Sequence, residues 1–157
     1  MFRQWIVAVA AVLVMCGCQA DKNKIIDEFH EVNIEKWGWH QGQTFSFTIT
    51  EPDYLYNVFC GVRITGDYAY SNIFLVYTID GPKTSQKHMF QIQLADNTGK
   101  WLGKGMNNLI AYEQQFIQNL KLQPGKYTLT FFQNMRDDEL KYVSDIGLKV
   151  LRTSKVY

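Results

Sequence analysis

Apolar and polar positions alternate along much of this chain and predict a series of short β-strands. The longest example spans residues 56–64, where Tyr, Val, Cys, Val and Ile occupy every second position. A period of two sends successive side chains to opposite faces, so one face of such a strand is buried and the other is wet. The same pattern predicts strands at residues 45–49, 90–94, 127–131 and 146–150.

Two further segments are less regular. Residues 73–79 are apolar at most positions, which predicts a central strand covered on both faces. The apolar positions of residues 106–122 fit a helical stripe about as well as a strand, and the strands on either side favour a strand. Firm turn signals separate the predicted elements at Asp80-Gly81-Pro82-Lys83 and Gln123-Pro124-Gly125-Lys126.

Short strands separated by turns, without a long helical pattern, indicate an all-β domain. We expect an antiparallel β-sandwich, with jelly-roll connectivity as one arrangement and a barrel as the alternative architecture. The chain has 157 residues, and the part that follows its N-terminal apolar segment has the usual size of one domain with one core.

The N-terminus has the pattern of an export signal. Arg3 precedes an apolar run from Trp5 to Met15, and small and polar residues follow. A membrane-spanning helix needs about 20 apolar residues, and this run is much shorter. Removal after export is therefore favoured over a permanent transmembrane anchor, and residues 1–17 are predicted to be the signal peptide.

The stretch Val14-Met15-Cys16-Gly17-Cys18 resembles the lipobox of bacterial lipoproteins, in which a small residue precedes an acylated cysteine. Cys18 fits this pattern, although Met15 stands where the pattern prefers leucine. An ordinary signal peptide that contains two cysteines is the alternative interpretation. With Cys18 lipidated, residues 18–35 are expected to be the lipidated N-terminus and tether, and residues 36–157 a single sandwich domain held at a membrane. Residues 27–34, within the tether, are a candidate for the start of the first strand.

Removal of the signal changes the charge and the cysteine count. The full chain has 16 Lys and Arg against 15 Asp and Glu, and the loss of Arg3 leaves 15 against 15. A neutral domain lacks the basic surface that nucleic acid requires, so we expect no nucleic-acid partner. With Cys18 carrying lipid, Cys60 has no cysteine to pair with, and its apolar neighbours predict a buried thiol.

Searches for catalytic, phosphate-binding and metal-binding motifs find no convincing candidate. No nucleophile elbow, zincin motif or Walker loop is present, and we expect neither catalysis nor a cofactor. The histidines have no metal-ligand spacing, so no metal is expected. Adjacent acids in a polar loop are usually solvated, and a glycine-rich stretch without the P-loop ending is better explained as a tight turn. The segments weighed in this way are His30, His40, His88, Asp137-Asp138-Glu139 and Gly99 to Gly105.

Aromatic residues near turns are the remaining candidates for a binding surface. Such residues can form a platform for sugar rings or for a protein partner, although β-sandwich cores also contain many aromatics. The candidates for partner or glycan binding are Trp37, Trp39, Tyr68, Tyr70 and Trp101.

Several stretches, taken in order, resemble the gliding-motility lipoprotein GldH family of the Bacteroidetes. The resemblance covers nearly the whole chain after the signal, and no single motif in it is specific alone. The stretches that carry it are Tyr68-Ala69-Tyr70-Ser71-Asn72-Ile73, Gly99 to Gly105, Pro124-Gly125-Lys126-Tyr127, and Gln133-Asn134-Met135-Arg136 through Asp145-Ile146-Gly147-Leu148.

The resemblance implies a cell-envelope lipoprotein associated with gliding motility and with the protein-secretion system linked to it. Its implied partners are a membrane, through lipid on Cys18, and other envelope proteins of the gliding and secretion machinery. The outer membrane is the expected location, and both the periplasmic and the surface-facing orientation stay open. A glycan-binding module on the envelope is the alternative function.

Overall fold

The computed structural model describes residues 21–106 and 108–156, and within them it contains eleven strands and no helix. The predicted signal peptide and the predicted lipidation residue, Cys18, lie outside the described residues. Within the described part of the chain, no helix is long and apolar enough to cross a membrane.

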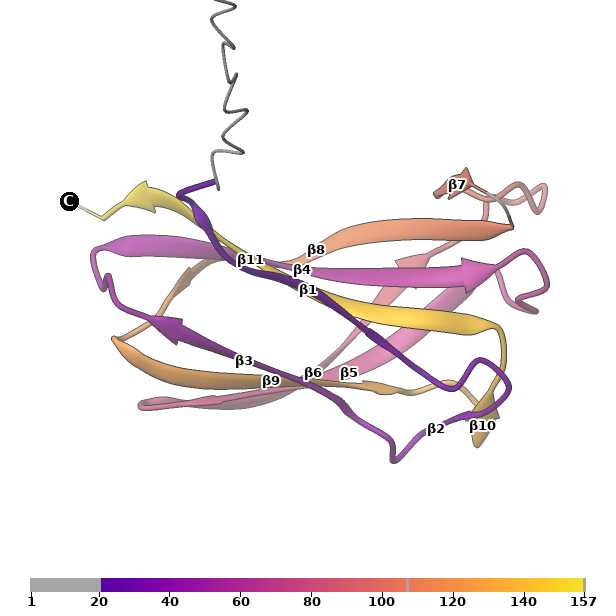
Figure 1. The fold of residues 1–157 in the computed structure, drawn as a ribbon, viewed down its shortest axis with the longest axis horizontal. Helices are drawn as coiled ribbons and strands as arrows, with labels where there is room; N and C mark the ends of the chain where they lie inside the picture. Colours follow the sequence, from indigo (N-terminus) through magenta and orange to yellow (C-terminus); the bar gives the residue numbers. More distant parts are fainter. Residues whose placement is uncertain (1–20, 107, 157) are drawn as a thin grey trace, which may run out of the picture.

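The strands form two antiparallel sheets that face each other (Figure 1). The first sheet has the order β1 (Lys24–Glu31), β11 (Val143–Lys155), β4 (Tyr54–Thr65), β8 (Leu109–Lys121) and β7 (Lys104–Met106). The second sheet has the order β3 (Gln43–Ile49), β9 (Gly125–Gln133), β5 (Asn72–Gly81) and β6 (Thr84–Gln93). A short additional pair joins β2 (Trp37–Gly38) to β10 (Glu139–Leu140).

Early and late strands interleave in both sheets. β11 lies between β1 and β4, and β9 lies between β3 and β5. This interleaving of the first and last strands is the arrangement of a double-sheet jelly roll. The predicted all-β antiparallel sandwich is therefore confirmed, and its connectivity is that of a jelly roll.

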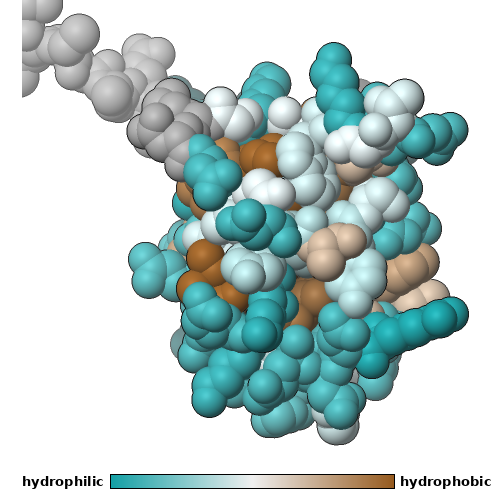
Figure 2. All heavy atoms as spheres, turned by 90° about the vertical axis from the view of Figure 1, so that its right-hand side faces the viewer, coloured by the Kyte–Doolittle hydropathy of each residue, from teal (hydrophilic) through white to brown (hydrophobic). Residues whose placement is uncertain are grey.

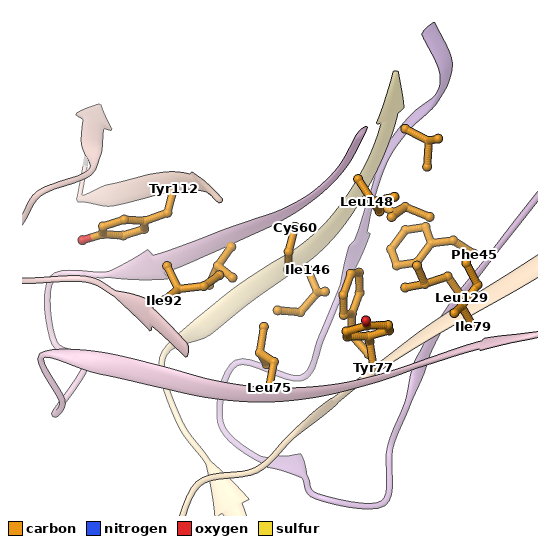
Figure 3. Close-up of a cluster of buried hydrophobic side chains, with 14 of the residues drawn as sticks. Phe45, Cys60, Leu75, Tyr77, Ile79, Ile92, Tyr112, Leu129, Ile146 and Leu148 are labelled. Carbon is orange, nitrogen blue, oxygen red and sulfur yellow. The ribbon is translucent and has the colours of Figure 1, made fainter. Parts of the chain in front are cut away.

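The core lies between the sheets and is built from the alternating positions. Side chains such as Cys60 and Ile146 from the first sheet point toward Leu75 and Leu129 from the second (Figure 3). Burial of such apolar side chains contributes about 25 cal/mol per Å² and is the main force that holds the sheets together. Cys60 is fully buried, as predicted, and this burial raises the pKa of its thiol.

Within the uncertain segment at 106–122, residues 109–121 form the strand β8, and a strand was favoured. β8 pairs with β4, but the register shifts twice opposite Val58, and Asn119 has a left-handed backbone with φ of 55°. Each shift moves the following side chains relative to the face they would otherwise occupy. These irregularities explain why no single period fits the sequence there.

The expectation for residues 73–79 is confirmed only in part. In β5 the side chains of Ile73, Leu75, Tyr77 and Ile79 are buried, and those between them are only half-buried. The strand is central within its sheet, yet only one of its faces lies against the other sheet. The apolar residues on its outer face, Phe74 and Val76, border the loop that follows β9.

The domain also begins earlier than expected. Residues 24–31, within the segment 18–35 assigned to a tether, form β1 and pair with β11 from Lys24↔Leu151 to Glu31↔Asp145. Ile26 of this strand belongs to the core. The strand reads as polar because it is an edge strand whose charged side chains face solvent.

Candidate functional site

The turn after β2 sends two nearby tryptophans in opposite directions. Trp37 is buried, and its indole Nε1–H donates to the carbonyl of Gln41 at 2.7 Å. The chain then reverses at Gly38, and the N–H of Trp39 donates to the carbonyl of Asp138 at 3.1 Å. As a result, the Trp39 side chain is 59% exposed beside the loop that follows β9.

A buried glutamine holds that loop, residues 134–138, in place. Gln133 is 2% exposed, its Nε2 donates to the carbonyl of Asp137 at 2.9 Å, and its Oε1 accepts from the N–H of Met135 at 2.8 Å. A buried amide with both ends bonded fixes the local backbone, because an unpaired buried polar group costs about 1–3 kcal/mol. The loop is thus tied to the end of β9.

The loop continues β9 beside β5, and its Asn134 side chain crosses the outer face of β5. The N–H of Asn134 donates to the carbonyl of Phe74 at 2.9 Å, and the Met135 sulfur lies 3.3 Å from the Phe74 nitrogen. The Asn134 amide also contacts the sulfur of Met89 on β6 at 3.1 Å. The apolar outer residues of β5 therefore border this loop. They are the residues that suggested a strand covered on both faces.

Two adjoining hollows, of about 490 and 710 Å³, flank the loop and share Asn134 and Met135. We call the combined depression the loop groove. Its volume is in the range of ligand sites, but it lies open on the outside of the second sheet rather than in a cleft. Seen end-on, the molecule is mostly hydrophilic, with apolar side chains in small areas (Figure 2). The residues that line the loop groove are Trp39, His40, Tyr70, Asn72, Phe74, Val76, Lys87, Met89 and Phe132 to Asp138.

A tyrosine and an acid close one side of the groove. The Tyr70 hydroxyl donates to Asp137 Oδ2 at 2.6 Å, and this hydrogen bond raises the pKa of Tyr70. Tyr70 lies in the stretch 68–73, and Asp137 lies in the stretch that begins at Gln133; both stretches carry the family resemblance. The fold brings these distant stretches together at the groove.

The five predicted aromatics do not share one exposed face. Trp37 and Tyr68 are buried, and burial raises the pKa of Tyr68. Trp101 is half-buried against the core and does not line the groove. Only Trp39 and Tyr70 line the loop groove.

Of the other residues weighed for chemistry, His40, Asp137 and Asp138 line the loop groove, whereas His30 and His88 lie elsewhere. Among the described residues, no three His, Cys, Asp or Glu side chains gather closely enough to hold a metal ion. His30 stacks on Phe45 at 4.1 Å between ring centroids, and His88 lies beside Tyr77. In the glycine-rich stretch, the Asp96 carboxylate accepts from Thr98 and Lys100, which lowers its pKa and makes a tight turn.

The residues that shape the groove were mostly missed by sequence reasoning. Gln133, Met135 and Met89 lie on three different segments, and nothing local in the sequence links them. Two signals were available: the run of apolar residues at 73–79, and the family-like stretches that contain Tyr70 and Gln133-Asn134-Met135-Arg136.

These features define a class of protein, the small jelly-roll domain that presents an open groove on the outside of one sheet. A sequence model described as GldH lipoprotein matches residues 24–150. The chain therefore belongs to the GldH lipoprotein family, and the resemblance seen in the sequence is confirmed.

Individual relatives agree with this assignment. The chain is 25% identical over 153 residues to the "Gliding motility lipoprotein GldH homolog" of Christiangramia forsetii, covering 90% of this chain and 91% of the relative. It is 24% identical over 154 residues to "Gliding motility lipoprotein GldH" of Flavobacterium johnsoniae, covering 92% and 93%. These names mention no catalytic activity.

A solved structure, the crystal structure of the infectious bursal disease virus VP2 subviral particle, is similar at 18% identity with a TM-score of 0.34. The match covers 92% of this chain and 37% of that chain. A likeness of this size supports no argument about fold or function.

Proposed function

We propose that this protein is a lipid-anchored envelope component that binds another envelope protein through the loop groove. It would act as an accessory part of the gliding-motility machinery and of the secretion system linked to it. The relatives named for gliding motility support the setting. The groove, with Trp39 and Met89 at 59% and 58% exposure, is the observation that carries the binding role. Trp and Met are enriched in protein interfaces, and Trp often dominates their energetics.

The orientation of the domain supports this role. β1 begins at the end of the sandwich that holds the β3–β4 turn, where Arg152 contacts Lys22 and Glu51. β2 and β10 lie toward the opposite end (Figure 1). β1 alone has eight residues and spans about 25 Å, at about 3.3 Å per residue. An anchor just before β1 would therefore hold the groove at a distance from the lipid surface.

Cys18 is the proposed anchor. A diacylglycerol together with an N-acyl chain would supply the multiple chains that stable anchoring requires, at about 0.8 kcal/mol per buried methylene. Labelling with an alkyne fatty acid should mark the wild type and Cys18→Ala should abolish the label. Cys16→Ala is the matched control and should keep it. Equal labelling of wild type and Cys18→Ala would contradict the proposal.

Protein binding at the groove is tested by co-purification from cross-linked envelopes. A specific partner should be recovered with the wild type and weakened by Trp39→Ala, because loss of a buried interface Trp costs about 2 kcal/mol or more, or roughly thirty-fold in affinity. Leu102→Ala is the control, since Leu102 is 56% exposed but does not line the groove. Repeated recovery of no specific partner, or equal loss in both variants, would count against the proposal.

Glycan binding is the second candidate, and Trp39 supports it, because an exposed indole beside the polar His40 and Asp138 can stack on a sugar ring. The burial of Trp37 and Tyr68 removes the wider aromatic platform on which this idea first rested. A polysaccharide array that shows Trp39-dependent binding would favour the glycan role over the protein role.

A further inference from the structure

β6 is an unusually regular edge strand. It pairs with β5 over ten residues without a register shift and pairs with no other strand of the described chain. Native proteins usually protect sheet edges with short strands, bulges, prolines or several charges. β7 is short and β1 is bulged and charged. β3 is also regular and uncharged, but it has only seven residues and β1 packs against it through the stack of His30 on Phe45. β6 is longer, at ten residues, and it contains no proline and only one residue charged at neutral pH, Lys87.

Neighbouring hydrogen bonds show which backbone groups of β6 are free. The N–H of Asn134 donates to the Phe74 carbonyl, so the N–H and C=O groups of Phe74 point toward β9. The N–H and C=O groups of Ile73 and Leu75 therefore point toward β6. The N–H of Leu94, just after β6, donates to Ser71 and therefore faces β5. Because these directions alternate along antiparallel strands, the backbone groups of alternate residues point away from β5. The residues with free groups are Ser85, Lys87, Met89 and Gln91.

The same residues direct their side chains to the outer face of the sheet. Met89 lies opposite Val76 and Lys87 lies opposite Thr78, and both Met89 and Lys87 line the loop groove. The free backbone edge and one wall of the groove are therefore made by the same residues. A strand placed beside β6 would present every second side chain to this wall.

We propose that β6 is a strand-addition site, at which an extended segment of the partner protein pairs with Ser85 to Gln91. This inference deepens the proposed protein-binding function and rests on it. A row of alternating N–H and C=O groups is matched by another polypeptide backbone, which favours an extended segment over a folded surface or a glycan. The bound strand would extend the second sheet and place its alternate side chains along the groove.

The chemistry of the edge specifies the segment. The Met89 side chain is 58% exposed, so the residue facing it is apolar. Lys87 is the charge of the strand, so the residue facing it, two positions along the segment, is acidic. β6 itself contains neither Asp nor Glu, so a second copy pairing through the same strand would bring another lysine and no acid. A partner with an apolar and an acidic residue at this spacing fits better than a second copy of this chain.

The test uses the full chain in detergent and an array of synthetic extended peptides of the length of β6. Thr and Val alternate in each peptide, the position facing Met89 is varied among Leu, Phe and Ser, and that facing Lys87 among Glu, Ser and Lys. Peptides with an apolar and an acidic residue should bind best. Gln91→Pro removes an outward N–H at a position where an edge strand tolerates proline, and should weaken binding about tenfold or more. Gln91→Ala is the matched control and should bind like the wild type.

Three results would overturn strand addition: no binding on the array, binding unchanged by Gln91→Pro, or wild-type self-association in detergent that Gln91→Pro abolishes. Circular dichroism and the urea midpoint of Gln91→Pro establish that the variant is folded. If it is unfolded, N-methylation of alternate peptide residues replaces it, because only methylation of the set facing β6 should abolish binding. Co-purification separates the two proposals: a partner lost with Trp39→Ala but retained by Gln91→Pro leaves groove binding intact and removes strand addition.

Discussion

Packing around Phe29 explains the residues Asp145-Ile146-Gly147, which belong to a stretch that carries the family resemblance. Its ring lies over Gly61 and Gly147 on the two adjacent strands β4 and β11, where an added Cβ would come within 2.4 and 2.7 Å of ring atoms. The Arg63 guanidinium stacks 3.8 Å from the centre of the same ring and lies 3.7 Å from Asp145. In Asp145-Ile146-Gly147, the acid faces Arg63, the isoleucine fills the core and the glycine makes room for the ring.

This packing predicts a coupled effect of two substitutions. Gly147→Ala should lower the free energy of unfolding by about 1–2 kcal/mol, because the new methyl group displaces Phe29 and its contact with Arg63. In a Phe29→Ala background the same substitution should cost much less, which a double-mutant cycle from urea unfolding measures. Gly105→Ala is the control and should have little effect, because an added Cβ there would lie 3.5 Å from the Leu109 carbonyl oxygen, an ordinary contact distance. Additive effects of the two substitutions would refute this description of the site.

At the same scale, exposure of single aromatics could not be predicted. Trp37 and Trp39 are two residues apart and would share a face in a regular strand. β2 ends at Gly38, and the turn fixed by Gln41 separates them, so one is buried and the other exposed. Similarly, Tyr68 is buried while Tyr70 reaches Asp137, a residue far away in sequence.

At the scale of elements, regular alternation was a reliable guide. The inward positions of β4, β9 and β11 follow the sequence pattern, because burial against the opposite sheet selects apolar residues at every second position. The alternating pattern was a poor guide in two places, the outer face of β5 and the edge strand β1. The loop at 134–138 borders the outer face of β5, so that face carries apolar residues that a solvent-exposed face would not. β1 is an edge strand whose charged residues hide the alternating pattern. Neither effect is local in sequence.

Strand pairing was also beyond the reach of the sequence. β6 follows β5 through a tight turn, so that pair is local, whereas β1 pairs with β11 at the far end of the chain. The loop groove depends on such long-range pairing, since β9 must lie beside β5 before residues 134–138 can cover it. The alternation of apolar and polar residues and the turn signals predict a sandwich, but they do not show which strands lie at its edges.

At the scale of the whole molecule, the chain entry and the loop groove lie toward opposite ends of the sandwich. The chain enters at the end where Arg152 contacts Lys22, and the loop groove lies toward the end that carries β2 and β10 (Figure 1). With Cys18 lipidated, as proposed, the domain would hold its groove away from the lipid, within reach of other envelope proteins. The membership of the GldH lipoprotein family fits a domain organised in this way.

The most direct test of this account is photo-crosslinking in living cells, with a photoreactive residue placed at position 89 or at position 128. Met89 lines the groove, whereas Thr128 is exposed on β9 of the same sheet near the end where the chain enters. The account predicts a discrete crosslinked product of one envelope protein from position 89, lost with Trp39→Ala, and none from position 128. The same product from both positions, or no product from position 89, would contradict it.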